Sequence, residues 1–216
     1  MTPNRVTAAR VVAAFAAVAL FNFGADALAA DLAAVLLTVA AIALDGLDGY
    51  LARSRGLATP LGAQIDILGD RVVENLFFTF FAVTGLISLW VPVLFFARGT
   101  VTDFLRSLAA RSGRSGFDRN SMLDTWWGRT LVASRASRVA YAVLKCVCFC
   151  CLGMLLPLRH LPLAQLNTCL LSAGQALTGV TAIFCLMRAI PVIWEGRRYF
   201  AAAEKAPRAV ATGAAR

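Results

Sequence analysis

Four acidic residues stand close together in the chain, in two pairs at the edges of apolar stretches: Asp45 with Asp48, and Asp66 with Asp70. The spacings of three and four place the two carboxylates of each pair on one face of a helix. If the connector over residues 54–61 reverses the chain, the two acidic faces meet. Four carboxylates repel one another and are costly beside lipid, so hard cations are expected between them. Ligands that are all oxygen suit Mg²⁺ or Mn²⁺ rather than zinc, and we expect two ions.

A site of this kind is suited to phosphate chemistry. Two metal ions clamp a pyrophosphate and stabilise charge on the leaving phosphate, and a carboxylate that is not fully used as a ligand can take a proton from an attacking hydroxyl. Gly49 and Ala52 lack bulk, so a nucleotide can approach the helix there, and Arg53 offers a fork of donors to a phosphate. The alternative is that each acid only marks a helix end. The joint spacing of the four acids favours the metal site.

The composition indicates which elements position these residues. The 216 residues are 59% hydrophobic and 15% charged, with a mean hydropathy of +0.71. Soluble domains have about a quarter charged residues, so a disordered chain, a coiled coil and an ordinary soluble globule are excluded. At about 20 residues per span, the length accommodates six transmembrane helices. We predict an all-α integral membrane protein with a single domain over residues 1–200 and a basic, flexible tail over residues 201–216.

Six apolar stretches are the predicted spans. They run over residues 11–25, 32–44, 67–89, 91–108, 139–156 and 166–190. The net charge of +9 could indicate a nucleic-acid partner, but the basic residues flank the spans, which is what the positive-inside rule produces. The three loops on the opposite side contain a single basic residue, Arg159. We therefore expect both termini in the cytoplasm, no nucleic-acid partner, and the acidic site at the cytoplasmic membrane interface.

The N-terminus allows a second interpretation. Arg5 and Arg10 precede an apolar stretch and small residues, which is the pattern of a cleaved secretory signal. The next stretch is also apolar, and an even number of helices fits the charges better, so we expect the first stretch to be retained as a span. The six cysteines lie in apolar runs, and the spacing of the central four cannot converge on tetrahedral zinc. Reduced thiols that behave as small apolar residues are expected.

Residues 45–70 read D-x-x-D-G-x-x-A-R-x8-G-x3-D-x3-D. On this pattern the chain resembles the CDP-alcohol phosphotransferases, also called CDP-alcohol phosphatidyltransferases. The resemblance implies about six transmembrane helices, with the pattern across the second and third. It also implies an enzyme of phospholipid biosynthesis that transfers a phosphatidyl or similar group from a CDP-linked donor, such as CDP-diacylglycerol, to an alcohol and releases CMP.

The same resemblance implies roles for individual residues. Asp45, Asp48 and Asp66 would ligate Mg²⁺ or Mn²⁺, and Asp70 would be both a metal ligand and the general base. Gly62 would allow a close approach of helices. The expected form of the protein is a homodimer in the bacterial inner membrane. The residues expected to bind the CDP donor are Asp48, Gly49, Ala52, Arg53 and Gly62.

Two further stretches resemble the phosphatidylglycerophosphate synthase branch of the family. The opening Pro3-Asn4-Arg-Val-Thr-Ala-Ala-Arg10 is similar to P-N-x-L-T-x-x-R. Arg98 and Arg106 keep the spacing of that branch's R-E-x6-R element, with Gly99 in place of its Glu. The resemblance implies glycerol-3-phosphate as the acceptor, and inositol phosphate or another polar alcohol is the alternative.

Basic side chains near the acids would hold the phosphate of such an acceptor. Arg98 lies inside an apolar stretch, where a charge is costly, and it shares a helix face with Arg106. Basic residues of this kind can also extend to anionic lipid headgroups. Glu74, one turn beyond Asp70, is expected to pair with Arg98 or Arg71. The predicted acceptor-phosphate residues are Arg98, Arg106, Arg135, Arg138 and Lys145.

Two other classes of protein are weighed against the enzyme. A cation transporter also contains carboxylates within its spans, but the second and third stretches hold no matching polar groups at greater depth. Inverted repeats, which are common in transporters, are not apparent either. An inactive membrane scaffold of the same family is the other alternative, and the intact acidic pattern argues against it.

Overall fold

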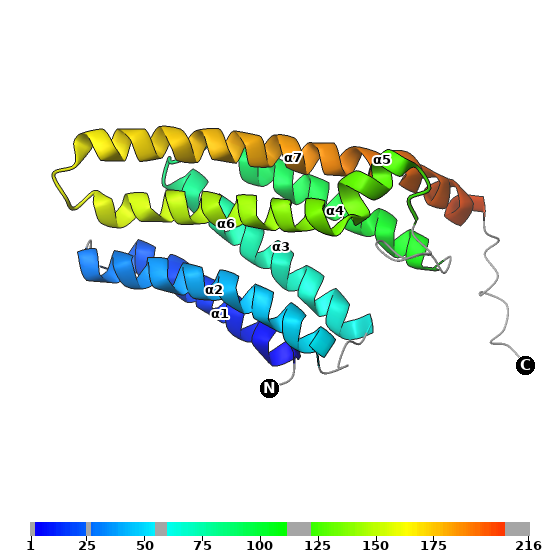
Figure 1. The fold of residues 1–216 in the computed structure, drawn as a ribbon, viewed down its shortest axis with the longest axis horizontal. Helices are drawn as coiled ribbons and strands as arrows, with labels where there is room; N and C mark the ends of the chain where they lie inside the picture. The colour runs from blue at the N-terminus through cyan, green and yellow to red at the C-terminus, as the bar shows by residue number, and fades with distance from the viewer. Residues whose placement is uncertain (1–2, 25–26, 55–59, 112–121, 206–216) are drawn as a thin grey trace, which may run out of the picture. The chain divides into compact units, whose positions relative to one another are not determined.

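The structure is a computed structural model that describes residues 3–24, 27–54, 60–111 and 122–205. The side chains of residues 3–4, 45–54, 60–61, 63, 111 and 201–205 lie outside the description. The described residues form helices and contain no strand (Figure 1), so the predicted all-α class is confirmed. In chain order the helices are α1 (Pro3–Phe23), α2 (Leu28–Ser54), α3 (Pro60–Val83), α4 (Trp90–Arg111), α5 (Trp126–Gly128), the π-helix η1 (Arg129–Ala133), α6 (Arg135–Leu158) and α7 (Ala164–Lys205).

Proline and glycine set several of these boundaries. α1 and α3 both begin at a proline, Pro3 and Pro60, whose fixed φ suits the first helical position. The turn after α3 contains Gly85 at a φ of +77°, a conformation that glycine adopts without steric cost. Each of the six predicted apolar stretches overlaps one long helix. The third was predicted to continue to residue 89, but α3 ends at Val83 because the chain turns at Gly85, and α1 ends at Phe23 rather than at residue 25.

Two compact units are formed by the chain, one from residues 1–96 and 141–183 and the other from residues 97–140 and 184–216. In the first unit, α1 and α2 lie side by side (Figure 1). Alanines at their buried faces, such as Ala17 and Ala34, are fully buried, and small residues of this kind allow helices to approach closely. α1 also contacts α3.

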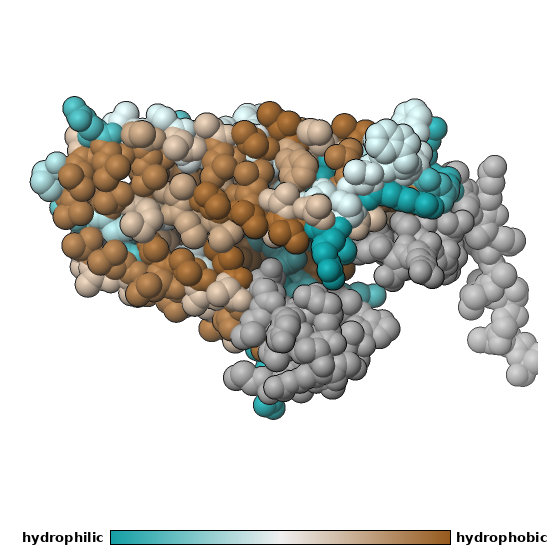
Figure 2. Space-filling view, viewed as in Figure 1, coloured by the Kyte–Doolittle hydropathy of each residue, from teal (hydrophilic) through white to brown (hydrophobic). Residues whose placement is uncertain are grey.

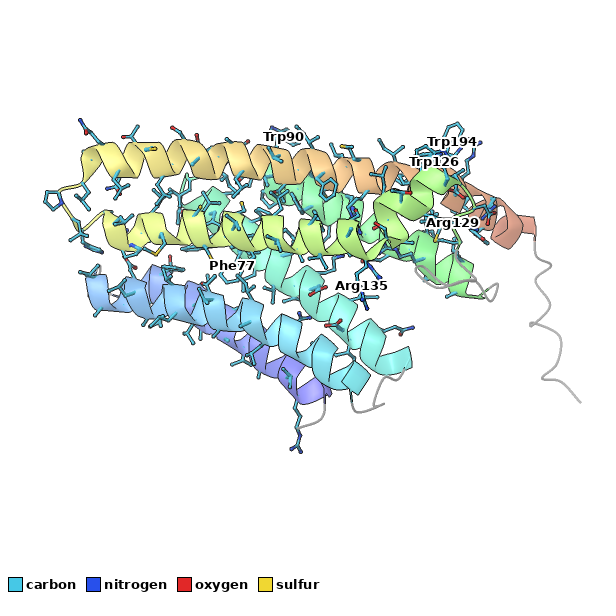
Figure 3. All side chains as sticks on the ribbon, in the orientation of Figure 1. Phe77, Trp90, Trp126, Arg129, Arg135 and Trp194 are labelled. Atoms are coloured by element: carbon cyan, nitrogen blue, oxygen red, sulfur yellow. The ribbon has the colours of Figure 1, made fainter. Side chains whose placement is uncertain are left out.

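An aromatic cluster holds α3 in the first unit. Phe77, Phe78 and Phe81 are fully buried on α3. The ring of Phe149 on α6 lies 5.2 Å from that of Phe77, which is labelled in Figure 3, and 4.9 Å from that of Phe78. Phe78 also contacts Phe95 of α4, with ring centroids 4.3 Å apart. Aromatic pairs add stability beyond the area that they bury, so these contacts fix the position of α3 and of the acids on it.

In the second unit, two charged side chains of α7 hold the segment that precedes α6. Glu195 accepts hydrogen bonds from the backbone N–H of Asp124 and the hydroxyl of Thr125, both at 2.5 Å. Arg188 donates to the carbonyls of Leu131 and Val132 at 2.8 and 3.3 Å. Carbonyls near a helix end need such partners. Much of the polar stretch before residue 138 is therefore ordered, and Trp126 is exposed on it (Figure 3).

Part of the predicted flexible tail is helical. α7 continues through Pro191 as far as Lys205, so residues 201–205 of the predicted tail are helical, and residues 206–216 lie outside the described residues. The buried face formed by Val192, Glu195 and Gly196 continues past the proline. Packing of that face offsets the hydrogen bond that Pro191 cannot donate.

The described helices have the features of a membrane protein. Three of them contain segments long and apolar enough to cross a membrane, over Arg5–Phe23, Arg135–Leu158 and Ala164–Phe200, and Leu28–Leu44 is a shorter apolar segment. α3 and α4 contain charged residues within their apolar stretches. Large apolar side chains are exposed, and Figure 2 shows them spread over α6 and α7 toward the loop that joins these helices. The number of six spans stays a prediction.

Candidate active site

Two carboxylates stand one turn apart on α3 and keep much of their surface open. The side chains of Asp66 and Asp70 are 44% and 46% exposed. Their spacing of four residues places both on one face of the helix, as the sequence predicted. Carboxylate oxygens in this position are accessible to a ligand from outside the helix bundle. The pair therefore supplies hard oxygen donors of the kind that Mg²⁺ and Mn²⁺ prefer.

One buried arginine of α1 connects the two carboxylates. Arg10 is 2% exposed, and its Nη1 donates to Asp70 Oδ1 at 2.8 Å while its Nη2 donates to Asp66 Oδ1 at 2.9 Å. Nη2 also donates to the backbone carbonyl of Asp66 at 2.9 Å. A planar guanidinium fixes the orientation of the carboxylates that it contacts. Its positive charge also offsets part of the repulsion between the two acids.

A glycine allows α1 to come this close to α3. A Cβ atom on Gly69 would lie 2.8 Å from Thr7 Cγ2 and 3.0 Å from Arg10 Nη2. Both distances are shorter than side-chain contacts normally permit, so Gly69 is required for the close approach. Because Gly69 lies directly before Asp70, this approach places the Arg10 guanidinium against the acidic face.

A second ion-pair cluster lies one turn further along α3. Glu74 is 2% exposed, and its Oε2 accepts a hydrogen bond from Arg71 at 2.9 Å. Its Oε1 accepts from the Tyr141 hydroxyl at 3.2 Å and lies 3.2 Å from Lys145 Nζ. Lys145 Nζ is also 4.8 Å from the centre of the Tyr141 ring. The expected pairing of Glu74 with Arg71 is confirmed, and Lys145 and Tyr141 of α6 are further partners.

The other residues of the acidic pattern are only partly described. Gly62 lies in the first turn of α3 and is half-buried. Asp45, Asp48, Gly49, Ala52 and Arg53 belong to the helical backbone of α2, and their side chains lie outside the described residues. Among the described side chains, no group of three or more His, Cys, Asp or Glu residues converges. Asp66 and Asp70 fit half of the predicted four-carboxylate site, and the metal site as a whole stays a prediction.

The predicted acceptor-phosphate residues have different surroundings. Arg98 is buried on α4, and Arg106 forms an ion pair with Asp103 at 3.1 Å. Arg135 and Arg138 are exposed at the start of α6, where Figure 3 shows Arg135. These four arginines belong to the second unit. Lys145 belongs to the first unit, where its contact with Glu74 brings it to α3.

Three residues of this site had no role assigned from the sequence. Arg10 entered the sequence analysis as part of the opening pattern and of a possible secretory signal, although a charge beside an apolar stretch also indicates a buried partner. Gly69 lies between two predicted acids, but its contact with α1 depends on Thr7 and Arg10, which are 62 and 59 positions away. Tyr141 carries no sequence signal of its own, because its partner Glu74 lies on a different helix.

Comparisons with known proteins agree with the acidic pattern. The model of the CDP-alcohol phosphatidyltransferase family matches residues 1–194. An archaetidylinositol phosphate synthase from Aeropyrum pernix is 30% identical over 105 residues, which cover 49% of this chain and 51% of that protein. A probable phosphatidylglycerophosphate synthase from Mycobacterium tuberculosis is 33% identical over 95 residues, which cover 44% of this chain and 46% of that protein. The chain thus matches about half the length of these relatives.

Proposed function

Because the chain belongs to the CDP-alcohol phosphatidyltransferase family, we propose that it transfers a phosphatidyl group from CDP-diacylglycerol to a polar alcohol and releases CMP. Membership of the family confirms the resemblance that residues 45–70 indicated. The observation that carries the proposal is the half-exposed Asp66–Asp70 pair held by a buried arginine. A pair of carboxylates used only to end a helix needs no buried arginine from another helix to orient it.

The chemistry assigns one role to each part of the acidic pattern. Asp45, Asp48, Asp66 and Asp70 would hold two Mg²⁺ or Mn²⁺ ions, which would supply positive charge to the pyrophosphate. Asp70 takes the proton of the acceptor hydroxyl. The hydroxyl oxygen then forms a bond to the β-phosphorus, which carries the diacylglycerol, and the bond from that phosphorus to the oxygen of CMP breaks. Arg10 keeps the Asp70 carboxylate in a fixed orientation. The donor's CDP would be bound by Asp48, Gly49, Ala52, Arg53 and Gly62.

The acceptor that we propose is glycerol-3-phosphate, and inositol phosphate is the alternative. The two relatives are named for a phosphatidylglycerophosphate and for an archaetidylinositol phosphate, so they do not select between these acceptors. Both acceptors carry a phosphate, which needs cationic partners. Lys145 beside α3 supports such a site, and Arg98, Arg106, Arg135 and Arg138 are proposed as further partners.

The placement in the membrane is also a proposal. Six spans with both termini in the cytoplasm follow from the distribution of basic residues, and the acidic site would then open at the cytoplasmic interface. There the acyl chains of the donor stay in lipid while its headgroup reaches the carboxylates. A homodimer in the bacterial inner membrane is the form expected of the enzyme.

CMP release from the purified protein tests the proposal. The assay contains CDP-diacylglycerol and Mg²⁺, with glycerol-3-phosphate, inositol phosphate, glycerol and inositol as separate acceptors. We expect release that depends on one phosphorylated acceptor and stops when the divalent cations are removed by a chelator. Asp70→Asn should lower the rate by about 10²–10⁴-fold, the usual contribution of a general base.

Asp31→Asn is the matched control, because it neutralises a carboxylate at the opposite end of α2 from the acidic pattern. If no acceptor supports release from folded protein that binds the donor, the proposed acceptors are wrong. If the donor does not bind either, the protein is better interpreted as a cation transporter or as an inactive membrane scaffold.

A further inference from the structure

The carboxylate of Glu74 is buried, and two cationic side chains lie against it. Its side chain is 2% exposed, whereas those of its partners Arg71 and Lys145 are 20% and 19% exposed. A buried carboxylate requires charged and hydrogen-bonding partners, and Arg71 and Lys145 both supply positive charge to Glu74. The cluster of these three side chains therefore has a net positive charge whose cationic members are partly open to solvent.

Both oxygens of Glu74 are already engaged. Oε1 is shared by the Tyr141 hydroxyl and Lys145 Nζ, each at 3.2 Å, and Oε2 accepts from Arg71. A group with this burial and these contacts cannot reach the hydroxyl of a substrate to take its proton. Glu74 therefore differs from Asp70, which lies one turn away on the same helix and is half-exposed.

Lys145 is held from two sides by this arrangement. Its Nζ contacts Glu74 and lies over the ring of Tyr141, at 4.8 Å from the ring centre. Lysine has a flexible four-carbon stem and three donors on its ammonium. Fixing the stem in advance lowers the entropic cost of binding an anion. The ammonium has three donors, so contact with Glu74 still leaves donors for a ligand.

We propose that Glu74 is a positioning residue, which holds the Lys145 ammonium where it binds the anionic group of the acceptor alcohol. This inference rests on the proposed function, in which Lys145 is a partner of the acceptor phosphate. Glu74 acts through Lys145 and Tyr141 and makes no contact with the substrate. Its removal affects binding of the acceptor and leaves binding of the CDP donor unchanged.

Steady-state kinetics of Glu74→Gln test the effect on the acceptor. The variant keeps the shape of the side chain and an oxygen that can accept from Tyr141, but it loses the charge that holds Lys145. We expect the KM for the acceptor to rise about tenfold, as for the loss of a hydrogen bond to a charged group. The kcat and the KM for CDP-diacylglycerol should stay within about twofold. Asp31→Asn, which neutralises a carboxylate of equal burial, should change none of the three.

A double-mutant cycle separates positioning from a general structural role. In a Lys145→Met background, Glu74→Gln should raise the acceptor KM no further, because the residue through which it acts is absent. The proposal would be overturned if the two substitutions raised the acceptor KM multiplicatively in the double variant. It would also be overturned if Glu74→Gln alone raised the KM for the donor as much as the KM for the acceptor. Tyr141→Phe removes one partner without a change of charge, and a rise of about threefold in the acceptor KM is expected.

A measurement on the lysine itself does not require activity. The chain contains two lysines, Lys145 and Lys205, so reductive methylation followed by mass spectrometry reports each separately. Lys145 should react several-fold faster in Glu74→Gln and in Tyr141→Phe than in the unchanged protein, while Lys205 keeps its rate. An unchanged Lys145 rate would refute the holding contact. Wild-type protein that releases no CMP refutes the proposed function instead, and the methylation rates then still decide whether Glu74 holds Lys145.

Discussion

Two ion-pair clusters on α3 are built in opposite ways. In the first, the cation is buried and the carboxylates are open: Arg10 is 2% exposed, and Asp66 and Asp70 are 44% and 46% exposed. In the second, the carboxylate of Glu74 is buried and its cations, Arg71 and Lys145, are partly open. The buried member of each cluster orients the open members. Open carboxylates suit metal ions, and open cations suit a phosphate.

The distance between the clusters matters for the proposed reaction. Asp70 and Glu74 are four residues apart, which is about 6 Å along a helix. A metal-bound pyrophosphate at the first cluster and the phosphate of an acceptor at the second would therefore lie side by side, with the acceptor hydroxyl between them. The comparison predicts that changes at the first cluster slow the reaction itself, whereas changes at the second weaken binding of the acceptor.

Among the substitutions that test this difference between the two clusters, the largest fall in CMP release is expected at Arg10. Arg10→Met keeps most of the side-chain volume but leaves the two carboxylates without their buried cation. Partners that orient metal ligands usually contribute about 10–100-fold to activity or metal affinity, so we expect CMP release to fall by that factor. The free energy of unfolding should fall by about 1–3 kcal/mol.

Arg10→Lys is the control for charge alone. It keeps the positive charge and loses the fork that contacts both acids, so its activity should lie between that of the unchanged protein and that of Arg10→Met. CMP release and the midpoint of thermal unfolding in detergent measure both effects. Activity equal to that of the unchanged protein in both variants would show that the acids need no orientation by α1.

A smaller effect on activity is expected at Gly69, which sets the distance between α1 and α3. In Gly69→Ala the new methyl group would lie 2.8 Å from Thr7 Cγ2, so α1 must move away. Overpacking of this kind costs about 1–3 kcal/mol, and displacement of Arg10 should lower CMP release about tenfold.

Gly179→Ala on α7 is the matched control, because nothing lies within 4 Å of its added Cβ. There alanine should increase the free energy of unfolding by about 0.5–1 kcal/mol without a loss of activity. Chemical denaturation of both variants, followed by circular dichroism, measures the difference. If Gly69→Ala behaved as Gly179→Ala does, the close contact of α1 with α3 would be refuted.

Local spacing predicted one part of the site, and long-range contacts determined the other. The helices, the shared face of Asp66 and Asp70 and the Glu74–Arg71 pair all depend on residues within one or two turns, so the sequence was sufficient for them. The contact of Arg10 with Asp70 joins residues 60 positions apart, and that of Tyr141 with Glu74 joins residues 67 apart. No spacing rule selects such partners, because they depend on how three helices pack.

The second unit illustrates the same limit. The last predicted apolar stretch ended at residue 190, directly before Pro191, yet α7 continues through this proline to Lys205, although proline removes a backbone donor. The helix continues because Glu195 contacts the segment before α6 and Val192 is buried in the core of that unit. Tertiary packing outweighed the local signal, and only the structure could reveal it.

The smallest effect on activity is expected at Asp31, another buried carboxylate of the first unit. Asp31 is 2% exposed, as Glu74 is, and its Oδ2 lies 3.0 Å from His160 Nε2 and 3.4 Å from Arg159 Nη2. It belongs to the first turn of α2, 14 residues and about 21 Å along the helix from Asp45. Asp31→Asn should lower the free energy of unfolding by about 1–2 kcal/mol, because it weakens the link between α2 and the loop after α6.

CMP release from Asp31→Asn should stay within about twofold of that from the unchanged protein, since distant sites act independently. A tenfold loss of release would mean that burial of a paired carboxylate anywhere in the unit controls activity, and the distinct roles of the two α3 clusters would then be wrong.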